Sequence, residues 1–384
     1  MAYVNYNYLY KIISLNEGDI MVQETYYIEK RVRDLRMLEQ LLKNELPKYV
    51  TPYFNHMSNK TNALSGTRLA YAEDLRIYFH FLKERSPLCS GLQIKDIPLE
   101  VLDRQTPEDI DEYLNYLECY SIGGRTYSNS FSGKARKLAS LRSFYYYLYS
   151  RKKVSSDPTA IIESIRIPDK EIIILNSEQK ALLYSAVNTG NVFRANERKW
   201  KFYLKTRLRD MAIFTLLLGT AMRISELVGI NIGDIDFNEQ SIRITRKGNK
   251  MSTVYYGEES RIALEAYLNP SDAECAAGFL GRSALLGSEA ETDALFLSLK
   301  NRRITPRSVQ VRFHEYTDPL FGAKNNFTPH KMRSTRGSQI YNETGDIYLV
   351  ADVLGHSSVE TTRKHYSKID VERKKKLTQS IDVF

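Results

Sequence analysis

Apolar residues in the first half of the chain recur at the spacing of amphipathic helices. The first such stretch covers residues 21–46, where one helical face is apolar and the rest of the surface is charged. Its apolar positions are Ile28, Val32, Leu35, Leu38, Leu41 and Leu42. The same spacing predicts helices near residues 67–82, 107–120 and 132–151. The pattern therefore predicts a helical domain preceded by a short helical extension.

Proline, glycine and short polar residues mark the ends of these helices. Pro87 ends the helix that begins near residue 67, and Gly123–Gly124 separates the two later helices. A polar segment that includes Pro168 is typical of an interdomain connection, and we place the hinge near residues 164–176. Asn176 is expected to cap the first helix of a second domain.

The second half begins with a polar stretch followed by a long apolar one. Residues 190–207 are polar and charged and contain Trp200, which predicts a loop or an insertion. Residues 208–230 are predicted to be helical with a break at Gly219. A fresh helix would then begin close to Arg223, which places that arginine at an exposed turn.

Three short strands are predicted after this helix. Residues 232–237, 241–245 and 253–256 alternate apolar and polar positions, and Gly248–Asn249 supplies a hairpin turn. Lys247 would lie at the tip of that hairpin. The fold class is therefore mainly α, with a small antiparallel β-sheet in the second domain.

Several residues of the helical domain have a structural and a functional interpretation. For residues 21–46 we favour a packing or solubilising helix over an arm-type DNA site, working from periodicity alone. The tyrosines at 145–147 more often pack in a core than stack on bases. Lys134, Lys137 and Arg142 on the same helix are better candidates for contacts to phosphate, although an ordinary solvated face remains an alternative for each.

Composition agrees with a polyanionic partner, although many soluble proteins are also mildly basic. The chain has 384 residues, 55 Lys plus Arg against 46 Asp plus Glu, a net charge of +9, and a pI of about 9.1. Its 3 cysteines, Cys89, Cys119 and Cys275, show no metal-ligand spacing and no disulfide pattern, so they are expected to be buried packing residues in a reducing compartment. With no apolar run long enough for a membrane span and no signal peptide, a cytoplasmic protein is expected.

Six residues in the second half match the needs of phosphate chemistry. An oxygen attacking a DNA phosphodiester creates extra negative charge, so its site requires fixed cations and hydrogen-bond donors. The candidates, in chain order, are Arg223, Lys247, His330, Arg333, His356 and Tyr366. Glu226 is three residues after Arg223 and is expected to hold its guanidinium in place. Pro329 fits the first turn of a helix that would bring His330 and Arg333 onto one face.

In these residues and their order the chain resembles the tyrosine recombinase (phage-integrase) family, and within it a Xer-type recombinase. The resemblance covers residues 45–384 and implies two domains that form a clamp around DNA. The expected division is a helical extension (residues 1–44), a core-binding domain (45–165), a linker (166–175) and a catalytic domain with its C-terminal tail (176–384). Ser334 departs from the family, in which many relatives carry a histidine, and the spacing from His356 to Tyr366 is one residue longer than in many members.

The resemblance also implies a role for each candidate. Tyr366 would attack the scissile phosphate and form a 3′-phosphotyrosyl link, while Arg223 and Arg333 clamp the nonbridging oxygens. His356 would donate a further hydrogen bond, and Lys247 would protonate the leaving oxygen. His330 would assist proton transfer on the tyrosine side. No cofactor, metal or ATP is expected.

The implied partners are double-stranded DNA recombination sites and three further copies of the chain. The tail, residues 367–384, would dock on a neighbouring subunit and link a homo-tetramer, although packing within its own subunit is an alternative. Accessory DNA-bending or directionality proteins are possible partners. Chromosome dimer resolution and the integration or excision of a mobile element both stay open.

Two rival functions share parts of this pattern. A DNA-binding regulator that has lost its chemistry would keep the basic charge and the helical domain, but it would lack some of the six residues. A type IB topoisomerase uses similar chemistry without exchanging DNA partners. The resemblance to the helical core-binding domain favours recombination.

Overall fold

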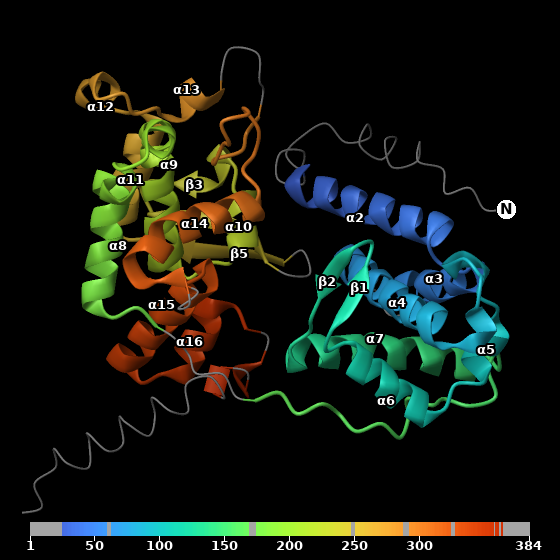
Figure 1. The fold of residues 1–384 in the computed structure, drawn as a ribbon. Coiled ribbons are helices and arrows are strands. Elements are labelled where there is room, and N and C mark those ends of the chain that lie inside the picture. The colour runs from blue at the N-terminus through green and yellow to red at the C-terminus, as the bar shows by residue number, and fades with distance from the viewer. Residues whose placement is uncertain are drawn as a thin grey trace, which may run out of the picture. The chain divides into compact units, whose positions relative to one another are not determined.

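The computed structural model describes residues 25–59, 63–168, 174–246, 250–286, 292–323, 327–356, 358–360 and 362–363. These residues form two compact units, one within residues 25–168 and the other within residues 174–363 (Figure 1). Helices dominate both units, and the described residues of each also form one small antiparallel sheet. The predicted fold class is therefore confirmed.

The first unit is built from helices that surround an aromatic core. Its α-helices are α2 (Thr25–Asn44), α3 (Thr51–Asn59), α4 (Ser65–Arg85), α5 (Leu99–Asp103), α6 (Pro107–Tyr116) and α7 (Phe131–Ser150). Short 3-10 turns are η1 (Lys48–Val50), η2 (Pro87–Cys89) and η3 (Ile94–Asp96). Tyr78 on α4 and Tyr145 on α7 are fully buried, and their hydroxyl oxygens lie 2.9 Å apart. A buried hydroxyl needs such a partner, so this pair fixes how the two helices pack.

Helix α2 shares the same core. Leu38 and Leu41 are buried against the helices that follow, and the Ser65 hydroxyl donates to the Asp34 carboxylate at 3.3 Å. The packing role predicted for this helix is confirmed. The domain boundaries at residues 44 and 165 stay predictions, and much of the proposed linker, residues 169–173, lies outside the described residues.

The break predicted at Gly123–Gly124 is a β-hairpin. Strand β1 (Tyr120–Ile122) pairs antiparallel with β2 (Arg125–Tyr127), and the two glycines between them have φ of 59° and 74°. Both central residues of a two-residue hairpin turn of this kind need positive φ, which glycine adopts without strain. The sequence located the turn but missed the short strands on either side.

The basic residues of α7 are engaged within the protein. Lys137 is 5% exposed, donates to Asn129 at 2.8 Å, and lies 3.8 Å from Asp74. Lys134 pairs with Glu118 at 2.7 Å, and Arg142 donates to the Ile162 carbonyl. The interpretation of Lys137 as a phosphate contact is therefore wrong, because burial removes its ammonium group from solvent.

The tyrosine run on the same helix separates into inner and outer residues. Tyr145 is fully buried and Tyr147 is half-buried against Tyr53, with ring centroids 5.5 Å apart. Tyr146, by contrast, is 68% exposed. Core packing is thus confirmed for Tyr145 and does not extend to the whole run, since consecutive residues on a helix point in different directions.

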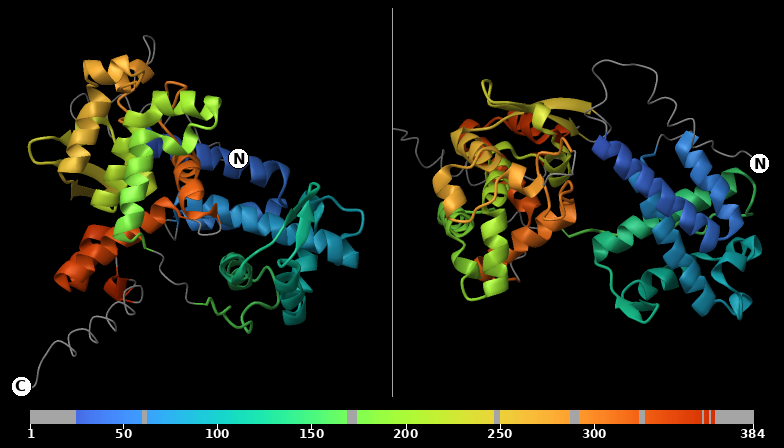
Figure 2. Two further views of the ribbon diagram at one scale, coloured as in Figure 1. Left: turned by 60° about the vertical axis from the view of Figure 1, so that its left-hand side comes forward. Right: turned by 90° about the horizontal axis from the view of Figure 1, so that it is seen from above.

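The second unit is a helical bundle with a three-stranded sheet along one side (Figures 1 and 2). Its α-helices are α8 (Ser177–Thr189), α9 (Glu197–Thr220), α10 (Ile224–Gly229), α11 (Glu258–Leu268), α12 (Asp272–Ala276), α13 (Arg282–Leu286), α14 (Pro306–Phe321), α15 (Pro329–Thr344) and α16 (Ile347–Leu354). The 3-10 turns are η4 (Asn191–Phe193) and η5 (Ile232–Asp234). The antiparallel strands are β3 (Ile235–Asp236), β4 (Ser241–Arg246) and β5 (Lys250–Tyr255), in that order across the sheet.

The prediction of a loop over residues 190–207 is wrong for its second half. Helix α9 begins at Glu197, and the Asn196 side chain caps it by accepting from the Lys199 amide at 3.0 Å. Trp200 belongs to this helix and stacks on Tyr203, with ring centroids 5.2 Å apart. Scattered apolar residues among charges concealed a helix whose buried face is narrow.

The cysteine prediction is also corrected. Cys89 is buried, as expected, but Cys119 and Cys275 are exposed, so packing does not explain them. All three are free thiols. Within the described residues, no helix has the length and apolar character to cross a membrane.

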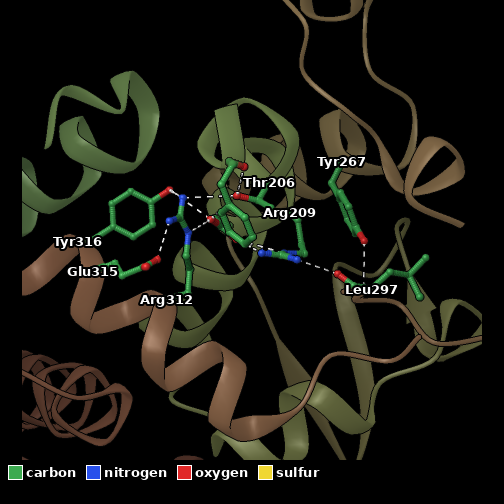
Figure 3. Close-up of polar contacts among 9 residues, drawn as sticks. Thr206, Arg209, Tyr267, Leu297, Arg312, Glu315 and Tyr316 are labelled. Atoms are coloured by element: carbon green, nitrogen blue, oxygen red, sulfur yellow. Dashed lines mark hydrogen bonds and ion pairs between the residues drawn. The ribbon is translucent and has the colours of Figure 1, made fainter. Parts of the chain in front are cut away.

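A buried ionic network joins α9 to α14 in the second unit (Figure 3). The Asp210 carboxylate, 1% exposed, accepts from Arg209 Nη2 at 2.7 Å and from Arg312 Nε at 2.6 Å. The Thr206 and Tyr316 hydroxyls donate to the same carboxylate at 3.0 and 3.2 Å. Burial by itself would raise the pKa of Asp210, but the two guanidinium groups outweigh it and hold that pKa below its ordinary value.

Candidate functional site

Arg223 occupies the sharp turn between α9 and α10. Helix α9 ends at Thr220, and Ala221 follows in the left-handed region with φ of 55°. Arg223 then has extended backbone angles and caps α10. The sequence predicted a helix break at Gly219, and α9 ends at the next residue. Arg223 therefore lies at the start of a new helix rather than inside a long one.

Glu226 holds Arg223 from two directions. Its carboxylate, 3% exposed, accepts from the Arg223 backbone amide at 2.7 Å and from Arg223 Nη1 at 2.8 Å. The arginine side chain is 34% exposed, so it is only partly buried. The predicted contact of Glu226 with the Arg223 guanidinium is confirmed. A charged donor held by a buried carboxylate is preorganised, because little side-chain freedom remains to be lost when an anion binds.

Arg333 is placed by α15, which begins at Pro329 as predicted. The side chain is only 4% exposed and reaches the turn between α9 and α10, where Nη1 donates to the Ala221 carbonyl at 2.5 Å. Its Nη2 donates to the Leu354 carbonyl at the end of α16. Arg333 therefore connects three elements: the α9–α10 turn, α15 and α16.

His356 follows directly after α16. Gly355 ends that helix in the left-handed conformation, with φ of 57°, and the His356 amide donates to the Ala351 carbonyl at 2.9 Å. The His356 Nδ1 atom lies 2.8 Å from the buried Thr362 hydroxyl. This contact constrains the orientation of the imidazole ring.

The C-terminal end of α16 brings three arginines together. Arg223 Nη2 donates to the Gly355 carbonyl at 3.3 Å, and Arg333 Nη2 donates to that of Leu354. Arg246, the last residue of β4, donates to the Asp352 and Val353 carbonyls at 3.4 Å each. Four consecutive carbonyl oxygens thus accept from three guanidinium groups. The helix end carries about half a negative charge, which favours cations there.

The remaining candidates are placed less completely. His330 lies in the first turn of α15 and is exposed, and its carbonyl accepts from the Ser334 hydroxyl at 3.2 Å. Ser334, the departure from the family pattern, thus bonds within its own helix. Burial lowers the pKa of the adjacent Lys331. Lys247 and Tyr366 lie outside the described residues. On either side of residues 247–249, Arg246 of β4 pairs with Lys250 of β5.

Sequence reasoning missed Arg246. The residue follows the buried Ile242 and Ile244 at intervals of two, so it occupies the face of β4 that packs on the core. The sequence did contain a signal for it: in the alternating pattern of this strand, position 246 is expected to be apolar, and it is an arginine. Its partner, the end of α16, is more than 100 residues away in sequence and only becomes its neighbour through folding.

The comparisons with known proteins identify the family. Residues 194–373 match the model of the phage integrase family. The tyrosine recombinase XerC of Caldanaerobacter subterraneus is 31% identical over 348 residues, which are 88% of this chain and 87% of that protein. The chain therefore belongs to the phage integrase family of tyrosine recombinases. It is a DNA breaking and rejoining enzyme that acts in site-specific recombination.

Other relatives of this recombinase support the Xer-type prediction. The XerC of Chlorobaculum parvum is 27% identical over 338 residues, covering 86% of this chain and 93% of that protein. A crystal structure of the XerH recombinase, described as a post-cleavage complex with palindromic difH substrate, has a TM-score of 0.58 at 17% identity. It covers 97% of this chain and 92% of its own. At that identity the likeness shows a shared fold.

Proposed function

We propose that this recombinase cleaves DNA through Tyr366, with Arg223, Arg333 and His356 stabilising the reacting phosphate. The tyrosine hydroxyl oxygen attacks phosphorus, the bond from phosphorus to the 5′ oxygen breaks, and a 3′-phosphotyrosyl link remains. The energy of the phosphodiester is kept in that link, so rejoining requires no ATP. The observation that carries the proposal is the convergence of Arg223 and Arg333 on adjacent carbonyls at the end of α16.

The arginine geometry suits a phosphate with increasing negative charge. The carbonyl groups satisfy guanidinium donors without adding a full negative charge, and Glu226 pairs with Arg223 through Nη1. His356 is directly after these carbonyls in the chain and adds a donor to the same region. We assign Lys247 the general acid role and His330 proton transfer near the tyrosine, whose ordinary pKa is about 10. We expect cleavage without a metal ion.

We further propose that double-stranded recombination sites are the substrate and that four copies act together. A DNA substrate is supported by the solved relatives, which include a Tn1549 transposon integrase in complex with transposon right end DNA and XerH bound to difH. In this proposal the C-terminal tail, residues 367–384, links neighbouring subunits and accessory proteins set direction. The protein would work in the cytoplasm, associated with the nucleoid. Both chromosome dimer resolution and movement of a mobile element fit this mechanism.

The test is to trap the covalent intermediate. Wild type and Tyr366→Phe are expressed in the native host, the cells are lysed in detergent, and protein-linked DNA is recovered and sequenced. We expect adducts at one recurrent site with the wild type and none with the variant. Adducts scattered over the genome would favour a topoisomerase, and DNA binding with no adduct would favour a regulator. Purified enzyme whose cleavage disappears with EDTA and returns with magnesium would contradict the metal-independent mechanism.

A further inference from the structure

Arg246 connects two parts of the catalytic unit that carry different proposed roles. It is the last residue of β4, directly before Lys247 in the chain, and it pairs across the hairpin with Lys250. Its side chain leaves the sheet and reaches the end of α16, where Nη1 and Nη2 donate to the Asp352 and Val353 carbonyls. The hairpin is thus attached to the helix end that also binds Arg223 and Arg333.

Gly355 lies directly against the Arg246 guanidinium. A Cβ atom on Gly355 would overlap the Arg246 guanidinium, and Gly355 has φ of 57°. Glycine at this position therefore serves two needs, the left-handed helix end and the space for an arginine. The Arg246 Nε is buried and has no hydrogen-bond partner among the described residues, so the side chain keeps this position despite one unsatisfied donor.

A general acid must be placed accurately to work. It has to lie within about 2.6–3.2 Å of the oxygen that it protonates, and a misplacement of about 1 Å can cost roughly 100-fold in rate. A short hairpin attached only through its own ladder would have freedom to shift relative to the bound phosphate. An arginine that donates to the end of α16, where Arg223 and Arg333 also donate, restricts that freedom directly at the residue before the acid.

We propose that Arg246 is a positioning residue for strand cleavage, which attaches the β4–β5 hairpin to the end of α16 so that Lys247 is held against the 5′ leaving oxygen. The inference rests on the proposed role of Lys247. It assigns Arg246 no contact with DNA. Loss of Arg246 should therefore impair proton delivery to the leaving oxygen and leave the arginine clamp and the attack by Tyr366 intact.

Proton delivery can be isolated with a substrate that does not require it. In normal cleavage Tyr366 gives up its hydroxyl proton with the help of His330 and its Oη bonds to phosphorus. The bond from phosphorus to O5′ breaks, and the Lys247 proton moves to O5′. If sulfur replaces the bridging 5′ oxygen, the leaving group is a thiol with a pKa of about 8.5, which departs as a thiolate without receiving a proton. A defect in general acid catalysis disappears on this substrate, whereas a defect in folding, binding or phosphate stabilisation persists.

The experiment compares Arg246→Ala with Arg243→Ala on matched oxygen and sulfur substrates, using single-turnover cleavage by the full chain. Arg243 is a suitable control because it lies on the same strand, is exposed on the opposite face, and donates instead to the Gly233 carbonyl at 2.9 Å. We expect Arg246→Ala to lose about 10-fold to 100-fold on the oxygen substrate and to recover to near the wild-type rate on sulfur. Arg243→Ala should behave as wild type on both.

Three further results decide the inference. Arg246→Lys keeps the charge but cannot bridge two carbonyls with a planar fork, so it should show a smaller loss with the same recovery on sulfur. Equal slowing of the Arg246 variants on both substrates, or no slowing at all, would overturn the positioning role. Lys247→Ala must also recover on sulfur. If it does not, the general acid role fails, and that result would be separate from any fault in Arg246.

Discussion

Arginine is used in two different ways in the catalytic unit. Arg209 and Arg312 donate to the carboxylate of Asp210 in the interior, so their charge is largely neutralised within the network (Figure 3). Arg223, Arg246 and Arg333 instead donate to four successive backbone carbonyls at the end of α16. Carbonyl oxygens bear only partial charges. The first cluster therefore stabilises the fold. The second holds Arg223 and Arg333 in place without adding a full negative charge at the carbonyls, while Arg246 attaches the hairpin to the same helix end.

Glu226 refines this comparison. It contributes a full negative charge beside Arg223, and yet it is placed on one side of the guanidinium, leaving Nη2 to the Gly355 carbonyl. Asp210, in contrast, accepts from two arginines and two hydroxyl groups at once. Asp210 thus binds several side-chain donors within a structural network, whereas Glu226 binds a single arginine at the proposed phosphate site.

The largest expected effect is on stability and comes from Asp210. Asp210→Asn should lower the free energy of unfolding by about 3–5 kcal/mol, because it removes the buried carboxylate that Arg209 and Arg312 share and leaves Arg312 with Glu315 as its partner carboxylate. Urea unfolding of the full chain measures this. Asp272→Asn, at an exposed position, is the matched control and should change stability by less than about 0.5 kcal/mol. If the two variants are equally stable, the Asp210 network does not stabilise the fold, and its proposed difference from the arginines at the end of α16 is wrong.

A smaller effect in energy, but on catalysis, is expected at Arg223. Arg223→Lys should slow single-turnover cleavage by about 10²–10³-fold, or about 2.7–4 kcal/mol, since one preorganised donor to the reacting phosphate is lost. Because the side chain is 34% exposed, stability should change by less than about 1 kcal/mol. Cleavage rates on a suicide substrate and urea unfolding separate the two effects. A variant that lost stability and kept its cleavage rate would place Arg223 with the structural arginines.

The smallest expected effect is a difference in acid sensitivity. The folded pKa of Asp210 lies below its ordinary value of 3.8, so the unfolded chain binds a proton at this residue before the folded chain does. Its contribution to stability is therefore complete above the unfolded pKa and is lost as pH falls through the folded pKa. Below about pH 4 the wild type should lose up to about 1.4 kcal/mol per pH unit more than Asp210→Asn. Arg223→Lys should keep the wild-type slope, and unfolding titrations between about pH 5 and pH 2.5 test both.

Local patterns in the sequence predicted much of the helical structure. Apolar periodicity located α2, α4, α6 and α7, and Pro329 marked the start of α15. Periodicity failed over residues 197–207, where charged residues cover most of the helix surface and only a narrow face is buried. It could not predict that Cys119 and Cys275 are exposed, since the burial of one residue depends on what packs over it.

The candidate site illustrates the same limit. Chemistry and spacing identified Arg223, Glu226, Arg333 and His356, because the residue types and their order are local information. They assigned Lys137 to a surface, whereas folding buries it beside Asp74. They also passed over Arg246, whose significance depends entirely on a partner in α16.

The sequence by itself determined the family, the kinds of residue available for phosphate chemistry, and the helices that carry them. The family follows from the resemblance that the six residues and their order carry, and the helices follow from apolar periodicity. Neither requires knowledge of distant contacts. Only the tertiary structure decided that the end of α16 gathers three arginines from a helix turn, a strand end and a buried helix face. The physical reason is that the last carbonyls of a helix have no partner within the helix and accept from whichever donors the fold brings near. Spacing along the sequence does not show which distant donors those are.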